Sequence, residues 1–197
     1  MKMPALRPAL LIASLAAGRG LAAQDIPTFH AGQWAAEFTG GDGASEGVMR
    51  FFSPRSALVI SGSASLSHNT AAPDNATEST SSLRSLFLAL GVRRHTTIAS
   101  RVLATTELGA NIGLSRGKTT ADAFGDPVTG RQSQTNYGIF GEIGGQYFVA
   151  SHLALGTVAT LSASRTSARA ESGGTGTDYR GFSLSTVLRP IRITLYF

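Results

Sequence analysis

The sequence predicts an all-β fold, an eight-stranded antiparallel up-and-down β-barrel, and three observations lead to this prediction. Apolar residues alternate with small or polar residues from Gln33 to the end of the chain, which is the period of β-strands. The connections between these runs are alternately short and long, as in a meander with one rim of tight turns. Only 15% of the 197 residues are charged, against about 25% in an ordinary soluble domain.

The first four strands are expected at about 32–40, 47–53, 57–68 and 82–93. The second run is shorter than the roughly 9–11 residues of a membrane-spanning strand. In the third, Leu58, Ile60 and Leu66 share one face, serines occupy the other, and Val59 breaks the alternation. The fourth has the clearest apolar face, formed by Leu86, Leu88, Leu90 and Val92.

The last four strands are expected at about 101–116, 134–149, 152–167 and 179–197. In these runs carboxylates and amides share the polar face with glycine and serine, opposite a face of aliphatic and aromatic residues. In the final run the apolar face shifts from even to odd positions at Pro190. Because proline cannot donate to a ladder, this shift predicts a β-bulge or a bend.

The connections fall into two classes. Short turns are expected at 53–56, 94–100 and 150–151, and long polar loops at 41–46, 69–81, 117–133 and 168–178. No helical period, linker or second domain is visible, so residues 24–197 are expected to form one barrel domain.

Residues 1–23 have the pattern of a secretory signal peptide. Lys2 and Arg7 precede an apolar segment of about ten residues, which ends in small residues. This segment is too short to span a membrane, and cleavage is expected after Ala22 or Ala23. A retained amphipathic anchor is the alternative.

Composition excludes several classes of protein. The chain has no cysteine, which excludes a disulfide scaffold, a zinc-thiolate site and a thiol nucleophile. Removal of the signal peptide lowers the net charge from +5 to +2, and the remaining basic residues are scattered. Because nucleic-acid binding needs a concentrated basic patch, no nucleic-acid partner is expected.

The chain ends in an alternating strand closed by a phenylalanine, which is similar to the assembly signal of bacterial outer-membrane barrels. The signal residues are Ile191, Ile193, Leu195, Tyr196 and Phe197. With the signal peptide, the even strand number and the unequal connections, the chain resembles the small eight-stranded outer-membrane barrels typified by the OmpA barrel and OmpX. The resemblance is architectural and covers nearly the whole mature chain.

The resemblance implies a transmembrane barrel in the cell outer membrane, inserted by the barrel-assembly machinery. Both termini would be periplasmic, the long loops would be outside, and the barrel would contact outer-membrane lipid and lipopolysaccharide. Hydrocarbon demands that every backbone group be paired, which a closed barrel achieves. Aromatic residues near strand ends are expected to form girdles; they are Trp34, Phe38, Phe51, Tyr137, Tyr147 and Phe197. A soluble lipocalin-like barrel is the alternative, and it would have the opposite polarity.

Polar residues on the inward face are expected to form a network in the lumen. They are Glu37, Arg50, Glu107, Asn111, Glu142, Gln146 and Arg192, with Tyr196 on the same face. The interior of an eight-stranded barrel is just wide enough for side chains, and buried charges must be paired. The favoured interpretation is a sealed lumen, and a narrow pore or proton path is the alternative.

No catalysis, cofactor or metal is expected. No histidine is followed two residues later by serine, an arrangement found in lipid-modifying outer-membrane enzymes, and His68 beside Ser67 is interpreted as a rim residue. The favoured function is a structural or surface-interaction role of a monomer, through extracellular loops and an unknown extracellular ligand. A narrow solute channel, a lipid-modifying enzyme and a soluble ligand-binding barrel are the alternatives.

Overall fold

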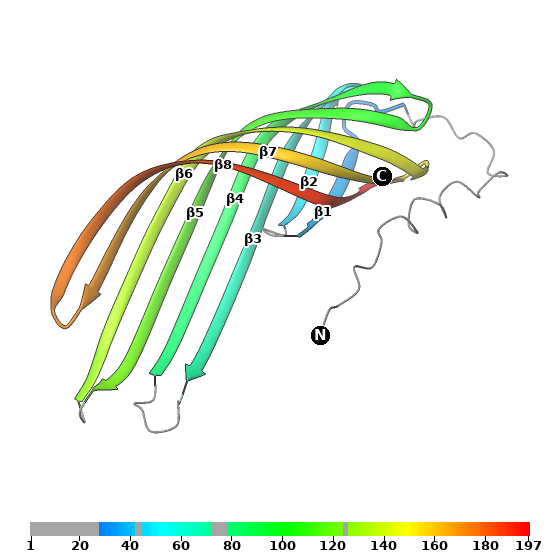
Figure 1. The fold of residues 1–197 in the computed structure, drawn as a ribbon. Helices are drawn as coiled ribbons and strands as arrows, with labels where there is room; N and C mark the ends of the chain where they lie inside the picture. The colour runs from blue at the N-terminus through cyan, green and yellow to red at the C-terminus, as the bar shows by residue number, and fades with distance from the viewer. Residues whose placement is uncertain (1–27, 42–44, 72–78, 124–125) are drawn as a thin grey trace, which may run out of the picture.

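The computed structural model describes residues 28–41, 45–71, 79–123 and 126–197. They form eight antiparallel strands, each paired with the next, and β1 pairs with β8 to close a barrel (Figure 1). The predicted eight-stranded up-and-down barrel is therefore confirmed. The strands are β1 (Trp34–Gly40), β2 (Ser45–Ser53), β3 (Ser56–Ala71), β4 (Ser79–Ala99), β5 (Val102–Ala123), β6 (Asp126–Ala150), β7 (Leu153–Ser172) and β8 (Thr175–Tyr196).

The signal peptide predicted for residues 1–23 lies outside the described residues. Within the described ranges, no helix has the length and apolar character needed to cross a membrane.

The two faces of the barrel have opposite polarity. On β4 the predicted apolar face points outward, and Leu88 and Leu90 are 46% and 52% exposed. The alternate residues Arg93 and His95 point inward and are buried. The same outward arrangement of aliphatic residues continues on β5, β6 and β7, so large apolar side chains cover the outside.

Within the described residues, the segments predicted as long loops are mostly strand, and that part of the prediction was wrong. In the described residues β4 begins at Ser79, β5 continues to Ala123, and β7 joins β8 through the turn at Gly173 and Gly174. Both turn glycines have positive φ angles, 57° and 84°, which side-chain-bearing residues rarely adopt. A strand exposed on both faces needs no apolar alternation, so its sequence resembles that of a loop.

The strands are unequal in length, which divides the barrel into two parts. β1 pairs with β8 only from Ile191 to Tyr196, and β2 pairs with β3 only as far as Gly62. We call the part closed by β1 and β2 the ring. The remainder, the extension, consists of β3 beyond Gly62, β8 before Ile191 and the adjoining parts of β4–β7, which continue past β1 and β2 (Figure 1).

A β-bulge lies at Pro190, as the shift of the apolar face predicts. Gly156 is opposite Arg192, whereas Val158 is opposite Arg189, so β8 contains one extra residue there. The Thr157 hydroxyl donates to the Arg189 carbonyl at 3.0 Å. Because of the bulge, both arginines point into the lumen.

Candidate functional site

A layer of charged side chains crosses the lumen of the ring, with Arg93 of β4 at its centre. Arg93 is 1% exposed and donates to both carboxylate oxygens of Glu37 on β1, with an Nη2–Oε1 distance of 2.9 Å. Its Nε donates to Oε2 of Glu107 on β5 at 2.7 Å. One guanidinium therefore links β1, β4 and β5 through the interior.

Two arginines of β8 complete the layer. Arg192 Nη2 donates to Glu142 Oε2 at 2.6 Å, and Arg192 Nε lies 3.2 Å from Glu37 Oε1. Arg189 Nη1 donates to Glu142 Oε1 at 3.2 Å and to the Thr160 hydroxyl at 3.0 Å. Thr160 in turn donates to Glu142 at 2.8 Å. Each charge in the layer has an opposite partner, as burial requires.

Gly91 makes room for this arrangement. A Cβ atom added at Gly91 would lie 2.3 Å from Glu107 Oε1, which is far inside van der Waals contact. The absent side chain therefore lets Glu107 lie against β4 and reach Arg93.

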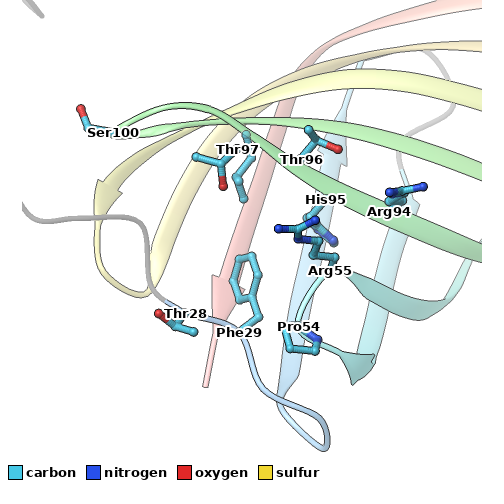
Figure 2. Close-up of a pocket in the computed structure, with 10 residues that line it drawn as sticks. Thr28, Phe29, Pro54, Arg55, Arg94, His95, Thr96, Thr97 and Ser100 are labelled. Carbon is cyan, nitrogen blue, oxygen red and sulfur yellow. The ribbon is translucent and has the colours of Figure 1, made fainter.

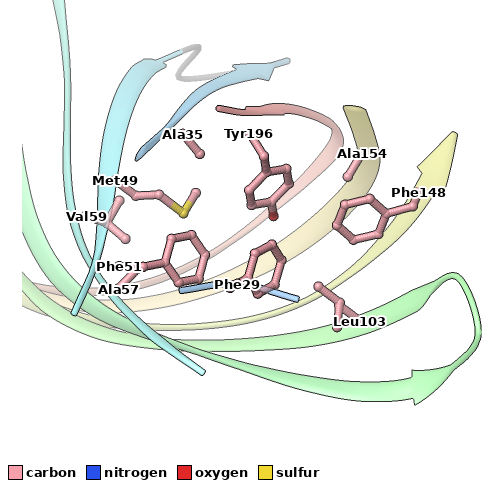
Figure 3. Packing of buried hydrophobic residues seen from close by; sticks show 10 residues of the cluster. All are labelled: Phe29, Ala35, Met49, Phe51, Ala57, Val59, Leu103, Phe148, Ala154 and Tyr196. Atoms are coloured by element: carbon pink, nitrogen blue, oxygen red, sulfur yellow. The ribbon is translucent and has the colours of Figure 1, made fainter. Parts of the chain in front are cut away.

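A cluster of buried apolar side chains, which we call the plug, fills the lumen near the rim of short turns (Figure 3). The ring of Phe29, which precedes β1, stacks on Phe51 at 4.5 Å and on Tyr196 at 5.0 Å between centroids. The Gly32 N–H donates to the Phe51 carbonyl at 2.7 Å, and the Phe51 N–H donates to the Gln33 carbonyl at 2.9 Å. The plug consists of Phe29, Ala35, Met49, Phe51, Ala57, Val59, Leu103, Phe148, Ala154 and Tyr196.

A chain of hydrogen bonds connects the plug to the charged layer. The Tyr196 hydroxyl donates to Gln146 Oε1 at 2.7 Å, and Gln146 Nε2 donates to the Thr194 hydroxyl at 3.0 Å. The Thr194 hydroxyl lies 3.4 Å from Glu37 Oε2. These buried polar groups are therefore satisfied as one network.

Two cavities lie on opposite sides of the plug and the charged layer. The luminal cavity, about 240 Å³, extends from the charged layer into the extension, where Asn111, Asn136 and Ser164 line it. The second, about 580 Å³, lies at the rim of short turns, where Phe29 and His95 line it (Figure 2). Between the two cavities lie the plug and the buried side chains of Glu37, Arg93 and Arg192, so the described side chains fill the lumen there.

The structure brings most of the predicted luminal residues together. Glu37, Glu107, Glu142 and Arg192 lie in the charged layer. Gln146 connects that layer to the plug. Asn111 lines the luminal cavity, and its side chain makes no hydrogen bond within the described residues.

The prediction was wrong for Arg50, which faces outward, with its guanidinium carbon 5.4 Å from the centre of the Trp34 ring. It was also wrong for Phe51, which was expected in an outer girdle and is 1% exposed in the plug. Both errors arise on β2, where Val48, Met49 and the neighbouring phenylalanines put apolar residues on both faces. The other predicted girdle residues are exposed, namely Trp34, Phe38, Tyr137, Tyr147 and Phe197.

Sequence reasoning missed three residues of the site. Arg93 lies on the polar face of its strand, so the alternation was sufficient to include it. Arg189 is in phase with the inward residues Ser183, Ser185 and Val187 that precede the bulge, so alternation was sufficient for it as well. Phe29 precedes the first strand, so no periodic pattern indicates it.

The residues of the predicted assembly signal lie on the two faces of β8 and just beyond it. Ile191, Ile193, Leu195 and Phe197 are outward and exposed, and Tyr196 is inward and buried. Their role in assembly stays a prediction.

No family model and no curated protein matches the chain. Among solved structures, it is similar to Acinetobacter baumannii CarO, with a TM-score of 0.42 and 9% identity over 87% of this chain and 98% of that one. It is also similar to Acinetobacter baumannii CarO2, with a TM-score of 0.41 and 10% identity over 88% of this chain and 100% of that one. Likeness at this level supports no inference about function, and the resemblance to the OmpA and OmpX class remains one of architecture.

Proposed function

We propose that the chain is an integral protein of a bacterial outer membrane, exported through a cleaved signal peptide, with a structural or surface-interaction role and no catalysis. The observation that carries the proposal is the reversed polarity of the barrel. Ion-paired side chains fill its interior, while exposed leucine, isoleucine and aromatic side chains cover its exterior. A soluble barrel would bury the apolar set, whereas hydrocarbon favours its exposure.

The apolar exterior also has suitable dimensions. On β4 the outward apolar residues lie between Arg94 and Arg84, both exposed. A strand tilted by about 40° rises roughly 25 Å over that interval, which matches the apolar band of outer-membrane barrels. On β5, β7 and β8 the outward apolar residues likewise end at an exposed arginine, namely Arg116, Arg165 and Arg180. These arginines fit the boundary between hydrocarbon and headgroups.

The closed lumen favours a structural role over conduction. A pore would need a continuous path past both the plug, whose side chains are buried, and the charged layer, where Glu37, Arg93 and Arg192 are buried. Opening the path would leave charges of the layer without partners, which is costly.

The extension supports the surface-interaction role. It consists of polar hairpins, exposed on most of their surface, that project from the rim opposite the short turns (Figure 1). We propose that this end is extracellular and presents a rigid surface to an unknown extracellular ligand. In this proposal the chain is a monomer that is inserted by the barrel-assembly machinery, contacts outer-membrane lipid and lipopolysaccharide, and binds no nucleic acid.

Single-cysteine labelling of intact Gram-negative cells tests the location and the orientation together. The chain has no cysteine of its own, so Ser172→Cys in the extension and Ser151→Cys in a short turn are matched probes. A membrane-impermeant maleimide is expected to label the first in intact cells and the second only after the outer membrane is opened. Recovery of the chain in the aqueous fraction without detergent, or labelling only at Ser151→Cys, would contradict the proposal.

Planar-bilayer recording tests the closed lumen. The refolded protein is expected to give no stable conductance steps. Reproducible steps from the unmodified chain would instead favour the narrow solute channel.

A further inference from the structure

A groove with five basic side chains lies on the outward face of the extension, over β4–β7. Its volume is about 440 Å³. The basic residues that line it are Arg84, Arg116, Lys118, Arg131 and Arg169. Ser82 and Ser133 add hydroxyl groups to the same lining.

Like charges face one another directly in this groove. Arg84 is the cross-strand neighbour of Arg116, and Lys118 is the cross-strand neighbour of Arg131. Outward pairs of this kind have Cβ atoms roughly 5 Å apart, and like charges there destabilise a sheet. Because Arg116 and Lys118 are successive outward residues of β5, the two repelling pairs are adjacent.

The protein supplies little compensation for this repulsion. Glu171, which also lines the groove, is opposite Arg131, and its Oε1 lies 2.8 Å from Arg169 Nε. Asp178 is opposite Arg169 in the next strand. Within the described part of the chain, the other four cations have no ion pair or side-chain hydrogen bond. The groove therefore has a marked excess of positive charge.

The groove lies at the upper boundary of the apolar belt. Leu86 and Leu114 are exposed. They are the outward residues next to Arg84 on β4 and next to Arg116 on β5, on the side of the apolar belt. One outward step along a strand is about 7 Å, and long basic side chains extend toward the polar boundary. The cations are thus placed where headgroups of the outer leaflet begin.

We propose that this groove binds the phosphate groups of a lipopolysaccharide-type glycolipid headgroup in the outer leaflet. The proposal rests on the outer-membrane location proposed above. The planar forks of arginine bind phosphate oxygens in pairs, and lysine adds a point charge. A phosphate between the strands converts both repelling pairs into bridges, which accounts for cations that the described chain leaves without partners.

Binding of a bisphosphorylated lipid A to the full chain, refolded in mixed detergent micelles, tests the site by native mass spectrometry. The test variant is Arg116→Glu/Lys118→Glu. It places carboxylates opposite Arg84 and Arg131, so favourable cross-strand pairs replace the repelling ones and the sheet is expected to fold. The matched control, Arg55→Glu/Arg94→Glu, makes the same charge change at the opposite rim, where both arginines are exposed.

The test variant is expected to bind lipid A at least about tenfold more weakly than the unmodified chain, because charge-assisted hydrogen bonds are lost. The control is expected to bind normally. Dephosphorylated lipid A is expected to bind the unmodified chain as weakly as lipid A binds the test variant. A second readout is thermal unfolding, which lipid A is expected to shift upward for the unmodified chain and the control only.

Equal binding of phosphorylated and dephosphorylated lipid would overturn the proposal, as would equal losses in the test variant and the control. Complete displacement of lipid A by inorganic phosphate at an equal concentration would show an adventitious anion site only and would also overturn it. These measurements use purified protein, whereas the cysteine labelling tests location in cells. Failure of lipid binding with surface labelling intact would therefore reject the groove alone.

Discussion

The inward faces of β3–β8 change completely between the ring and the extension. In the ring they carry large or charged side chains that are almost fully buried, such as Arg93, Leu103 and Gln146. In the extension they carry mainly small hydroxyl and amide residues, and the serine pairs Ser162–Ser185 and Ser65–Ser85 hydrogen-bond at 2.7 Å while remaining exposed.

This difference shows that one set of strands can combine a stable base with a polar, solvent-accessible surface. Among the described residues, buried apolar side chains and buried ion pairs stabilise the ring, whereas the extension depends mainly on its backbone ladders. Substitutions of inward residues should therefore affect stability strongly in the ring and weakly in the extension.

The largest effect is expected for Arg93→Met. It leaves Glu37 and Glu107 without their central cation, and a buried carboxylate without a partner costs about 3–5 kcal/mol. Urea unfolding of the protein refolded in detergent measures the loss. The control, Ser183→Ala in the extension, is expected to change stability little.

Restoring charge balance tests the cause of this loss. Arg93→Met combined with Glu37→Gln and Glu107→Gln is expected to recover much of the stability, because no carboxylate is then left facing the missing guanidinium. If the triple variant is as unstable as the single one, lost packing rather than unpaired charge explains the effect.

Phe29→Ala is expected to come next, with a loss of about 3 kcal/mol, as for a buried aromatic side chain. The ring of Phe29 fills the centre of the plug, between Phe51 and Tyr196. The matched control is Phe52→Ala at the same rim, where the side chain is 57% exposed. Equal losses in urea unfolding would show that the plug contributes nothing beyond ordinary surface contacts.

Gly91→Ala tests close packing in the charged layer. Its methyl group would overlap Glu107, and overpacking of this kind costs about 1–3 kcal/mol. Gly181→Ala in the extension is the control, because no atom lies within 4 Å of its added Cβ. Thermal unfolding of both variants should show a lower midpoint for Gly91→Ala only.

The same comparison explains how far the sequence predicts the molecule. Alternation defines the ring well because its two faces differ sharply in polarity, as in Leu88 to Val92 on β4. It fails in the extension, where both faces are polar, so 117–133 resembled a loop although all its described residues are strand.

Within the site, the alternation of apolar and polar residues predicts only which way a side chain points along a regular strand. It places Glu37, Glu107 and Glu142 inward because their strands are regular. It misplaces Arg50 because β2 has apolar residues on both faces. Alternation with Ser183 and Ser185 is sufficient to place Arg189 inward, because the parity of β8 reverses only at Pro190. The Phe29 contact joins a segment before β1 to the ring interior, and such a long-range contact leaves no local pattern.

The smallest effects are expected at the boundary between the ring and the extension. On β7 this boundary lies between Thr160 and Ser162, which are neighbouring inward residues. Thr160 accepts from Arg189 and donates to Glu142, so Thr160→Val leaves two charged groups short of a partner at a cost of about 1–3 kcal/mol. Ser162→Ala/Ser185→Ala removes both partners of an exposed hydrogen bond and is expected to change the free energy of unfolding by less than about 0.5 kcal/mol. Urea unfolding of the two variants compares the loss of a hydroxyl group at Thr160 with its loss at Ser162, the next inward position of β7. Equal losses would mean that the ordered interior continues into the extension, and the division between the two parts would then have to be placed farther along the strands.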